Sequence, residues 1–386
     1  MNKSTFALAA LALIAASCTK TEVVGSGPET SGSGINFSAY TAKPTKAAQT
    51  DVTTAKFTSF EVTAIGNGAI YFDDVTFLKS SESGVWESTP QYFWPAFALN
   101  FYAYNTPEKG VFTRNIDANN ETLTFAPSST LAEQEDLVAA KALNQTLAST
   151  NPSLATGLTF NHYLTQVIVK AKNSNSTYKV EVDGVKFANL AGEGTYSFST
   201  EKMAAPEGKI NSSTSADYVA TFGATELSDT ETEVMTDGDA GRWYLVPQEV
   251  KPWDQANNKD NASVVATNNG TYLALKVKIT AKHGNSILKI YPATGDDSAW
   301  MAVPVPVAQD ATEFALAQGK KYTFIINFFS DNSKSGAGFV DPEEPGDLDG
   351  DAGTSDAGKP IVGNVIKFSA EVNNWDETNT EITINL

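Results

Sequence analysis

The sequence predicts an all-β protein, and three observations support this prediction. Residues 271–282 alternate between apolar and polar side chains, as a strand with one buried face does. Residues 178–187 form two short alternating runs around Asp183-Gly184, a dipeptide typical of hairpin turns. Clusters of Gly, Asn, Asp and Ser separate such runs at short intervals, which favours antiparallel β-sandwiches. Further strands are expected at 319–329 and 365–372.

The chain begins with the pattern of an exported lipoprotein. Lys3 precedes an uncharged run from Phe6 to Ala16, which has the length of a signal-peptide core and is shorter than the roughly 20 residues of a membrane helix. Cys18, the only cysteine of the 386 residues, follows this run as in bacterial lipoprotein signals. We expect a signal peptide at 1–17 and a lipid on Cys18, and a single cysteine excludes an intrachain disulfide. The alternative is an ordinary signal peptide with a cysteine that has no role.

Composition limits the partners. The chain is long enough for two domains, and 41% of its residues are hydrophobic, which suffices for extended cores. Its net charge of −18 disfavours nucleic acid and anionic lipid, because phosphate binding needs Lys and Arg. The acidic residues concentrate at 228–241 and 341–358, which we expect to be solvated loops.

Residues 18–34 are rich in Gly, Ser, Pro and Thr and predict a flexible tether. The first strand is expected at 35–42, where one alternating set of residues faces the core. A second segment poor in apolar residues, 330–360, predicts an acidic linker before the terminal strands at 364–386.

One segment disagrees with the all-β prediction. Residues 130–143 are rich in good helix formers, and their propensity alone predicts a helix.

Catalytic motifs are missing from the sequence. It has two histidines and no nucleophile elbow, P-loop, zinc-binding HExxH or dinucleotide fingerprint. His162 lies in a strand-like run and is expected to be a packed, hydrogen-bonded residue. Residues 347–351 resemble the start of a calcium loop, but the twelfth position holds Gly358 in place of the required Glu. We therefore predict no enzyme activity, no metal and no cofactor.

The aromatic-rich stretch 91–105 has two interpretations. It could stack sugars on exposed rings, or it could be a strand whose residues of one parity face the core. The second is favoured, because Phe93, Phe97, Leu99, Phe101 and Ala103 share one parity. The predicted buried core of the N-terminal domain consists of Trp94, Phe97, Phe101, Phe160 and Val167.

The order of several motifs resembles the fimbrillin family, the type V pilins and related pilus lipoproteins of some Gram-negative anaerobes. After the lipoprotein start come "YFWPAFALNFYAY", "EDLVAAKA", "LTFNHYLTQVIV", "RWYLVPQ", "QGKKYTFIINF" and "KFSAEVNNW". The resemblance implies two transthyretin-like antiparallel β-sandwich domains in tandem, which we place at 35–172 and 173–386. It also implies an extended "DLVAAKA", against the helix propensity, and a non-catalytic role in assembly and cell adhesion.

The resemblance further implies a mode of assembly. Such pilins reach the outer membrane as lipoproteins (palmitate is among the expected lipid chains), a surface protease removes the N-terminal strand, and a C-terminal strand of another subunit fills the groove. Here 35–42 would be the removable strand, and Lys46 is the better cleavage site because Lys43 precedes Pro44. The candidate donor residues are Ile366, Phe368, Ala370, Val372, Ile382, Ile384 and Leu386.

Three other functions are compatible with the sequence. The chain could be an anchor or accessory lipoprotein of the same fold that is never cut. It could be a glycan-binding surface lipoprotein, for which several tryptophans must be exposed on one face. A glycosidase is a more distant alternative. The tryptophans in question are Trp86, Trp94, Trp243, Trp253 and Trp300.

Overall fold

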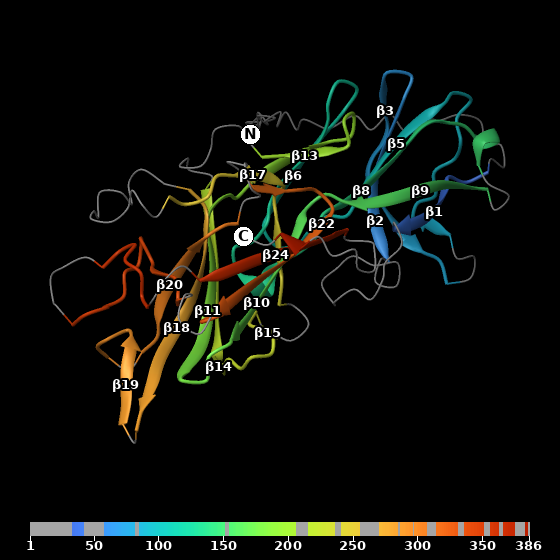
Figure 1. Ribbon diagram of the computed structural model, residues 1–386. Coiled ribbons are helices and arrows are strands. Elements are labelled where there is room, and N and C mark those ends of the chain that lie inside the picture. Colours follow the sequence, from blue (N-terminus) through green and yellow to red (C-terminus); the bar gives the residue numbers. More distant parts are fainter. Residues whose placement is uncertain are drawn as a thin grey trace, which may run out of the picture. The chain divides into compact units, whose positions relative to one another are not determined.

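A computed structural model describes most of the chain after residue 32 (Figure 1). The described residues are 33–41, 58–81, 85–150, 154–205, 215–235, 241–254, 270–284, 286–295, 297–306, 314–330, 336–350, 356–362, 366–374 and 383–384. They form strands and two short 3₁₀ helices, η1 (Leu131–Glu133) and η2 (Leu147–Ser149). Among them, no helix has the length and apolar character to cross a membrane. The all-β prediction is therefore confirmed, whereas the tandem boundary between 172 and 173 stays a prediction.

Seven strands close into a barrel in the order β1-β4-β3-β2-β5-β8-β9. Their bounds are β1 (Asn36–Thr41), β2 (Ser59–Gly66), β3 (Ala69–Lys79), β4 (Trp86–Ser88), β5 (Leu99–Tyr104), β8 (Val138–Gln145) and β9 (Ala155–His162). Most neighbours are antiparallel, but β1 runs parallel to β9 (Figure 1). Because β1 pairs with β9 on one side and β4 on the other, this strand closes the barrel.

A four-stranded sheet has the order β13-β12-β7-β6. It consists of β6 (Val111–Ile116), β7 (Glu121–Ala126), β12 (Gly194–Ser197) and β13 (Lys202–Ala204). Its buried Leu123, Phe125 and Tyr196 pack with Tyr102 and Tyr104 of β5. The outer face of one barrel strand is thus covered by residues from two distant parts of the chain.

Two larger sheets share a second core. One has the order β15-β10-β22-β24-β25 with β16 on β10, the other β14-β11-β18-β20-β23 with β19 on β18. A two-stranded sheet pairs β17 with β21. The bounds are β10 (Thr165–Asn173), β11 (Tyr178–Ala191), β14 (Ser215–Glu226), β15 (Thr232–Glu233), β16 (Trp243–Leu245), β17 (Gln248–Val250), β18 (Tyr272–His283), β19 (Ser286–Tyr291), β20 (Ala299–Pro304), β21 (Phe314–Leu316), β22 (Lys320–Phe328), β23 (Phe339–Val340), β24 (Lys367–Asn374) and β25 (Thr383–Ile384).

The helix expected at 130–143 is wrong. Only η1 is helical there, and β8 begins at Val138. Val138, Ala139 and Ala140 are buried because β8 pairs with both β5 and β9 of the barrel. Tertiary packing overrides local propensity here, as it does when a segment is central to a sheet.

The acidic segment 330–360 differs from the expected linker in its described parts. Ala337 and Val340 are fully buried, and β23 pairs with β20. Asp341 is also fully buried, because Lys186 neutralises it at 2.9 Å. The charge density of this segment therefore reflects specific ion pairs as well as solvation. In the other acidic stretch, Asp229 and Glu231 are exposed as expected, but Thr232 and Glu233 form β15, and Val234 and Met235 are fully buried.

The predicted core is confirmed in part. Phe101 and Phe160 are fully buried in the barrel, and Trp94 is half-buried against it. Val167 is fully buried, but it packs in the second core through β10. Phe97 and Phe93 are 38% and 46% exposed, so their assignment to the core is wrong. The alternation fails because residues 91–98 are not a strand, and β5 begins only at Leu99.

Candidate functional site

Strand β1 presents one apolar face to the barrel interior. Ile35 and Phe37 are fully buried and Ala39 is 4% exposed, whereas Tyr40 on the other face is 58% exposed. This alternation arises because successive side chains of a strand point to opposite faces. The expectation that 35–42 packs its alternate residues inward is confirmed for its described residues.

Phe37 lies in an aromatic cage. Its ring centroid is 4.7 Å from that of Phe77, 5.0 Å from that of Phe101 and 6.0 Å from that of Phe60, all edge to face. Such pairs contribute beyond the apolar area they bury. The rings from β2, β3 and β5 form the walls of a slot in the barrel, and the Phe37 side chain of β1 fills this slot.

The backbone of β1 satisfies the edges of two other strands. It pairs with β9 from Asn36↔Ala155 to Thr41↔Phe160, and with β4 at Phe37↔Trp86. The amide of Ile35 also donates to the Tyr92 carbonyl at 2.7 Å. Loss of β1 would leave unpaired backbone groups on β9 and β4 beside an empty apolar slot, a state that favours pairing with another strand.

Strand β24 has a similar inward face in the second core. Ile366, Phe368 and Ala370 are 4%, 8% and 0% exposed, and the Phe368 ring centroid is 5.5 Å from that of Phe324. The strand pairs with β22 in antiparallel register (Figure 1). Val372 at its end is half-buried.

The other candidate donor residues follow β24. Ile384 pairs with Ala370 through β25. Ile382 and Leu386 lie outside the described residues, as do Lys46 and Cys18. Their roles in donation, cleavage and lipidation stay predictions.

Comparison of the two strands shows a repeat that sequence inspection missed. Residues 35–39 read Ile-Asn-Phe-Ser-Ala, and residues 366–370 read Ile-Lys-Phe-Ser-Ala. In both, the Ile, Phe and Ala face a core. A search of the chain against itself, as is usual for longer repeats, could have found this short identity.

His162 is packed and hydrogen-bonded, as predicted. It is 6% exposed, and its Nδ1 lies 2.6 Å from Oδ2 of the buried Asp136. The pair links the end of β9 to the chain that leads into β8.

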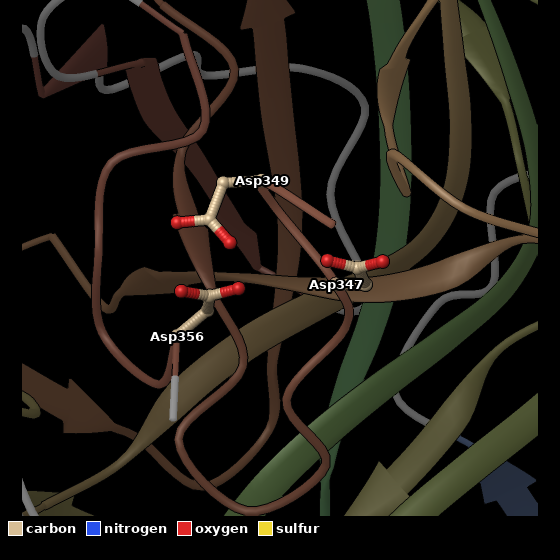
Figure 2. Close-up of side chains that lie close together, drawn as sticks. All are labelled: Asp347, Asp349 and Asp356. Atoms are coloured by element: carbon tan, nitrogen blue, oxygen red, sulfur yellow. The ribbon is translucent and has the colours of Figure 1, made fainter. Parts of the chain in front are cut away.

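Three aspartates gather in the acidic segment (Figure 2). One carboxylate oxygen from each of Asp347, Asp349 and Asp356 lies within 4.8 Å of the others. Asp356 is paired with Lys359 at 2.7 Å and accepts from the amide of Leu348 at 2.9 Å. Asp347 accepts from the Thr294 hydroxyl and from the amide of Gly350, and these hydrogen bonds, that from Thr294 most of all, lower the pKa of Asp347. These hydrogen bonds and the ion pair explain why the aspartates gather here, because they hold the loop of the acidic segment together.

The five tryptophans within the described part of the chain do not form an exposed face. Trp86, Trp243, Trp253 and Trp300 are between 0% and 7% exposed, and Trp94 is half-buried. The surface of stacked tryptophans that the glycan-binding hypothesis required is therefore contradicted.

Comparison with known proteins identifies the family of this chain. A family model described as fimbrillin-like matches residues 30–342. The chain belongs to the fimbrillin-like family. A search of curated proteins found no match to this fimbrillin-like chain.

Solved structures of similar fold cover most of the fimbrillin-like chain. A fimbrial protein from Bacteroides vulgatus has 16% identity and a TM-score of 0.48, covering 76% of this chain and 94% of its own. A candidate cell adhesion protein from Parabacteroides distasonis has 9% identity and a TM-score of 0.48, covering 90% and 97%. One from Bacteroides uniformis has 13% identity and a TM-score of 0.43, covering 89% and 98%.

Family membership supports a pilus-related role at the cell surface for this fimbrillin-like protein. It agrees with a structural role in adhesion and assembly with other pilus subunits.

Proposed function

We propose that this protein is a pilus subunit that polymerises by strand exchange, with β1 as the strand removed and β24 as the strand donated. The observation that carries the proposal is the shared Ile-x-Phe-Ser-Ala pattern. In β24 it offers the same three inward side chains that β1 places in the barrel slot. A strand added to an open sheet edge gains main-chain hydrogen bonds and fills the pockets for alternate side chains.

The energetics of the exchange are nearly balanced. Withdrawal of β24 exposes Ile366, Phe368 and Ala370 and one edge of β22. Insertion into the slot of a second subunit buries the same apolar groups again and pairs them with β9. An exchange of like elements between protomers has a low net cost, as in domain swapping. Cleavage between β1 and β2 gives the exchange its direction, because β1 then loses its covalent connection to the barrel.

Export and processing complete the proposal. A lipid on Cys18 would hold the precursor at the outer membrane, and cleavage after Lys46 would release the rest of the chain from that lipid. Cys18→Ala should abolish labelling by a palmitate analogue and prevent delivery to the surface. Lys46→Gln should leave residues 35–41 in the mature protein, whereas the control Lys43→Gln should be processed normally. N-terminal sequencing of the surface protein reads out both variants.

The exchange itself is tested on denaturing gels without boiling, where polymers persist. Phe368→Asp should abolish the ladder, because it would bury an unpaired charge in the slot. Lys367→Asp is the matched control, since Lys367 is on the exposed face of the same strand. Deletion of residues 379–386 should leave the ladder intact. A ladder lost on deletion but kept in Phe368→Asp would assign donation to the terminal residues instead.

A peptide assay avoids any folding defect in the Phe368 variant. A synthetic peptide of residues 365–374 should block polymerisation of cut wild-type protein, and the same peptide with Phe368→Asp should not. If the parent retains β1 in its mature form and never polymerises, the uncleaved anchor or accessory role is the correct one.

A further inference from the structure

A buried lysine on β11 faces away from the second core. Lys186 is 1% exposed, while its neighbour Phe187 packs in the core on the opposite face. Around Lys186 lies a separate apolar cluster that includes Trp253, Tyr272, Trp300 and Phe339. The Nζ of Lys186 is 5.5 Å from the Tyr272 ring centroid and 5.3 Å from that of Trp300. A lysine is rarely buried to this degree unless it is paired.

The partner is Asp341, which directly follows β23. Its Oδ2 lies 2.9 Å from Lys186 Nζ, and the side chains are 2% and 0% exposed. The pair joins two segments far apart in the sequence, and both side chains are shielded from solvent. Burial of two charges has a large desolvation cost that the pair only partly repays.

The other oxygen of Asp341 is held by three donors. Oδ1 accepts from the amides of Glu343 at 2.8 Å and Glu344 at 2.9 Å, and from the Tyr272 hydroxyl at 3.3 Å. Backbone amides aimed at one carboxyl oxygen are the arrangement that stabilises a developing oxyanion. Oδ1 is thus prepared to carry negative charge, while Oδ2 faces the amine.

A second carboxylate contacts the same amine. Glu344 Oε1 is 3.2 Å from Lys186 Nζ, and its side chain is 61% exposed. Because Glu344 Oε1 already accepts a hydrogen bond from the amine, it can take a proton from it. Burial lowers the pKa of Lys186, but the charge and hydrogen bond of Asp341, aided by Glu344, outweigh this and raise it. The resting pair is therefore ionic.

We propose that Lys186 and Asp341 condense into an intramolecular amide bond. One ammonium proton moves from Nζ to Oδ2, which leaves a neutral amine beside a neutral acid. The Nζ lone pair attacks Cγ, and the charge gathers on Oδ1 among its three donors. Glu344 takes a second proton from nitrogen and delivers it to the Oδ2 hydroxyl. Oδ2 then leaves as water, the carbonyl re-forms, and the nitrogen keeps one hydrogen.

Proximity and the apolar shell drive the condensation. Groups held in a reactive geometry act at effective concentrations of about 10⁵ to 10⁸ M. The bond replaces two buried charges by a neutral amide, which would be as shielded from solvent as the two side chains are now. The product is a covalent link between β11 and the segment that precedes β24. The sheet that contains β11 and β23 would therefore stay cross-linked while β24 is withdrawn.

Peptide mapping of the protein isolated from cells decides the proposal. Trypsin cleaves after Lys186 only if its amine is free. We expect no such cleavage, and a branched peptide that joins residues 186 and 341 with a mass lower by one water than the sum of its arms. Lys186→Arg should abolish the branched peptide. On boiled denaturing gels the parent should migrate faster than Lys186→Arg, because its chain contains a closed loop.

The controls separate the amide from other losses of water. Lys172 and Glu231 form an exposed pair at 2.9 Å, so Lys172→Arg should leave the branched peptide unchanged. Glu344→Gln should slow its appearance after refolding by about 10²- to 10⁴-fold, the usual contribution of a proton-transfer group. Efficient cleavage after Lys186 in the parent, or a loss of water that persists in Lys186→Arg, would overturn the proposal. Either result would leave strand exchange unaffected.

Discussion

Strands β1 and β24 carry the same five-residue pattern in different surroundings. Strand β1 runs parallel to β9, also pairs with β4 and completes a closed barrel. Strand β24 runs antiparallel to β22, and its other neighbour, β25, pairs with it at Thr383 and Ile384. Strand β1 is thus part of a closed barrel, whereas β24 lies one strand from the edge of its sheet. The comparison teaches that one five-residue pattern suits two different places in a sheet, and that under the proposed exchange β1 would leave a closed barrel while β24 would leave the edge region of a sheet.

The largest expected effect tests how much the packing of Phe37 in the barrel slot stabilises the fold. Phe37→Ala should lower the free energy of unfolding of the uncut protein by about 3–5 kcal/mol, because it empties a cage of aromatic rings. Tyr40→Ala is the control on the exposed face and should change it by less than about 0.5 kcal/mol. Urea denaturation of both variants measures the difference. Equal effects would mean that β1 is not held by its inward face.

The equivalent change in β24 should have a smaller effect. Phe368→Ala should cost about 3 kcal/mol, the lower end of the range for buried phenylalanines, because this ring is 8% exposed and Phe37 is fully buried. The same denaturation series checks it. A cost equal to or above that of Phe37→Ala would show β24 to be as firmly held as β1, which would weaken the case for its withdrawal.

Hydrogen exchange compares the strands without mutation. The amides of β24 should exchange faster than those of β22, since β22 has long-paired neighbours on both sides, whereas β24 has β22 on one side and only the two-residue β25 on the other. Mass spectrometry of deuterated peptides resolves the two strands. Equal protection of β24 and β22 would argue against local opening at β24.

The smallest effect concerns a polar site on the barrel strand β2. Desolvation by burial raises the pKa of Glu61, and this outweighs the hydrogen bond from Thr106 at 3.0 Å. A carboxyl whose pKa is higher in the folded state destabilises the fold when it is ionised. Glu61→Gln should therefore stabilise the protein slightly at pH 7. The gain should vanish as the pH falls below the ordinary value of 4.5, where both states are protonated. Denaturation curves at pH 7 and pH 4 measure it, and a gain independent of pH would contradict this cause.

The sequence predicted the strands whose pattern is local. Alternation found β1, β18 and β24, because the period-two signal depends only on which face is buried. Alternation failed at Phe93 and Phe97, where the chain bends before β5. Helix propensity failed at 130–143, where the pairing of β8 with β5 and β9 makes the residues from Val138 on a strand.

The candidate sites follow the same division. Inward residues of β1 and β24 were predictable, since each set lies within one short run. The Lys186–Asp341 pair was not, because its members come from distant segments and the acidic composition around Asp341 is typical of a solvated loop. Only the fold brings that lysine and that carboxylate together.

The connection between β9 and β10 has a mechanical consequence. Only Tyr163 and Leu164, both buried, separate β9, on which the incoming strand would be seated, from β10. Strand β10 runs parallel to β22 from Gln166↔Lys321 to Asn173↔Phe328, and the chain leads from β22 on to β24, which the exchange moves to the next subunit. Tension along a fibre would thus pass from the incoming strand to β9, on to β10, across the β10–β22 ladder and along the chain to the donated β24. It would load the hydrogen bonds between the incoming strand and β9 and those between β10 and β22 in shear. Strands such as β14 and β19 lie outside this line of force, so their exposed loops can diversify in sequence without weakening the filament.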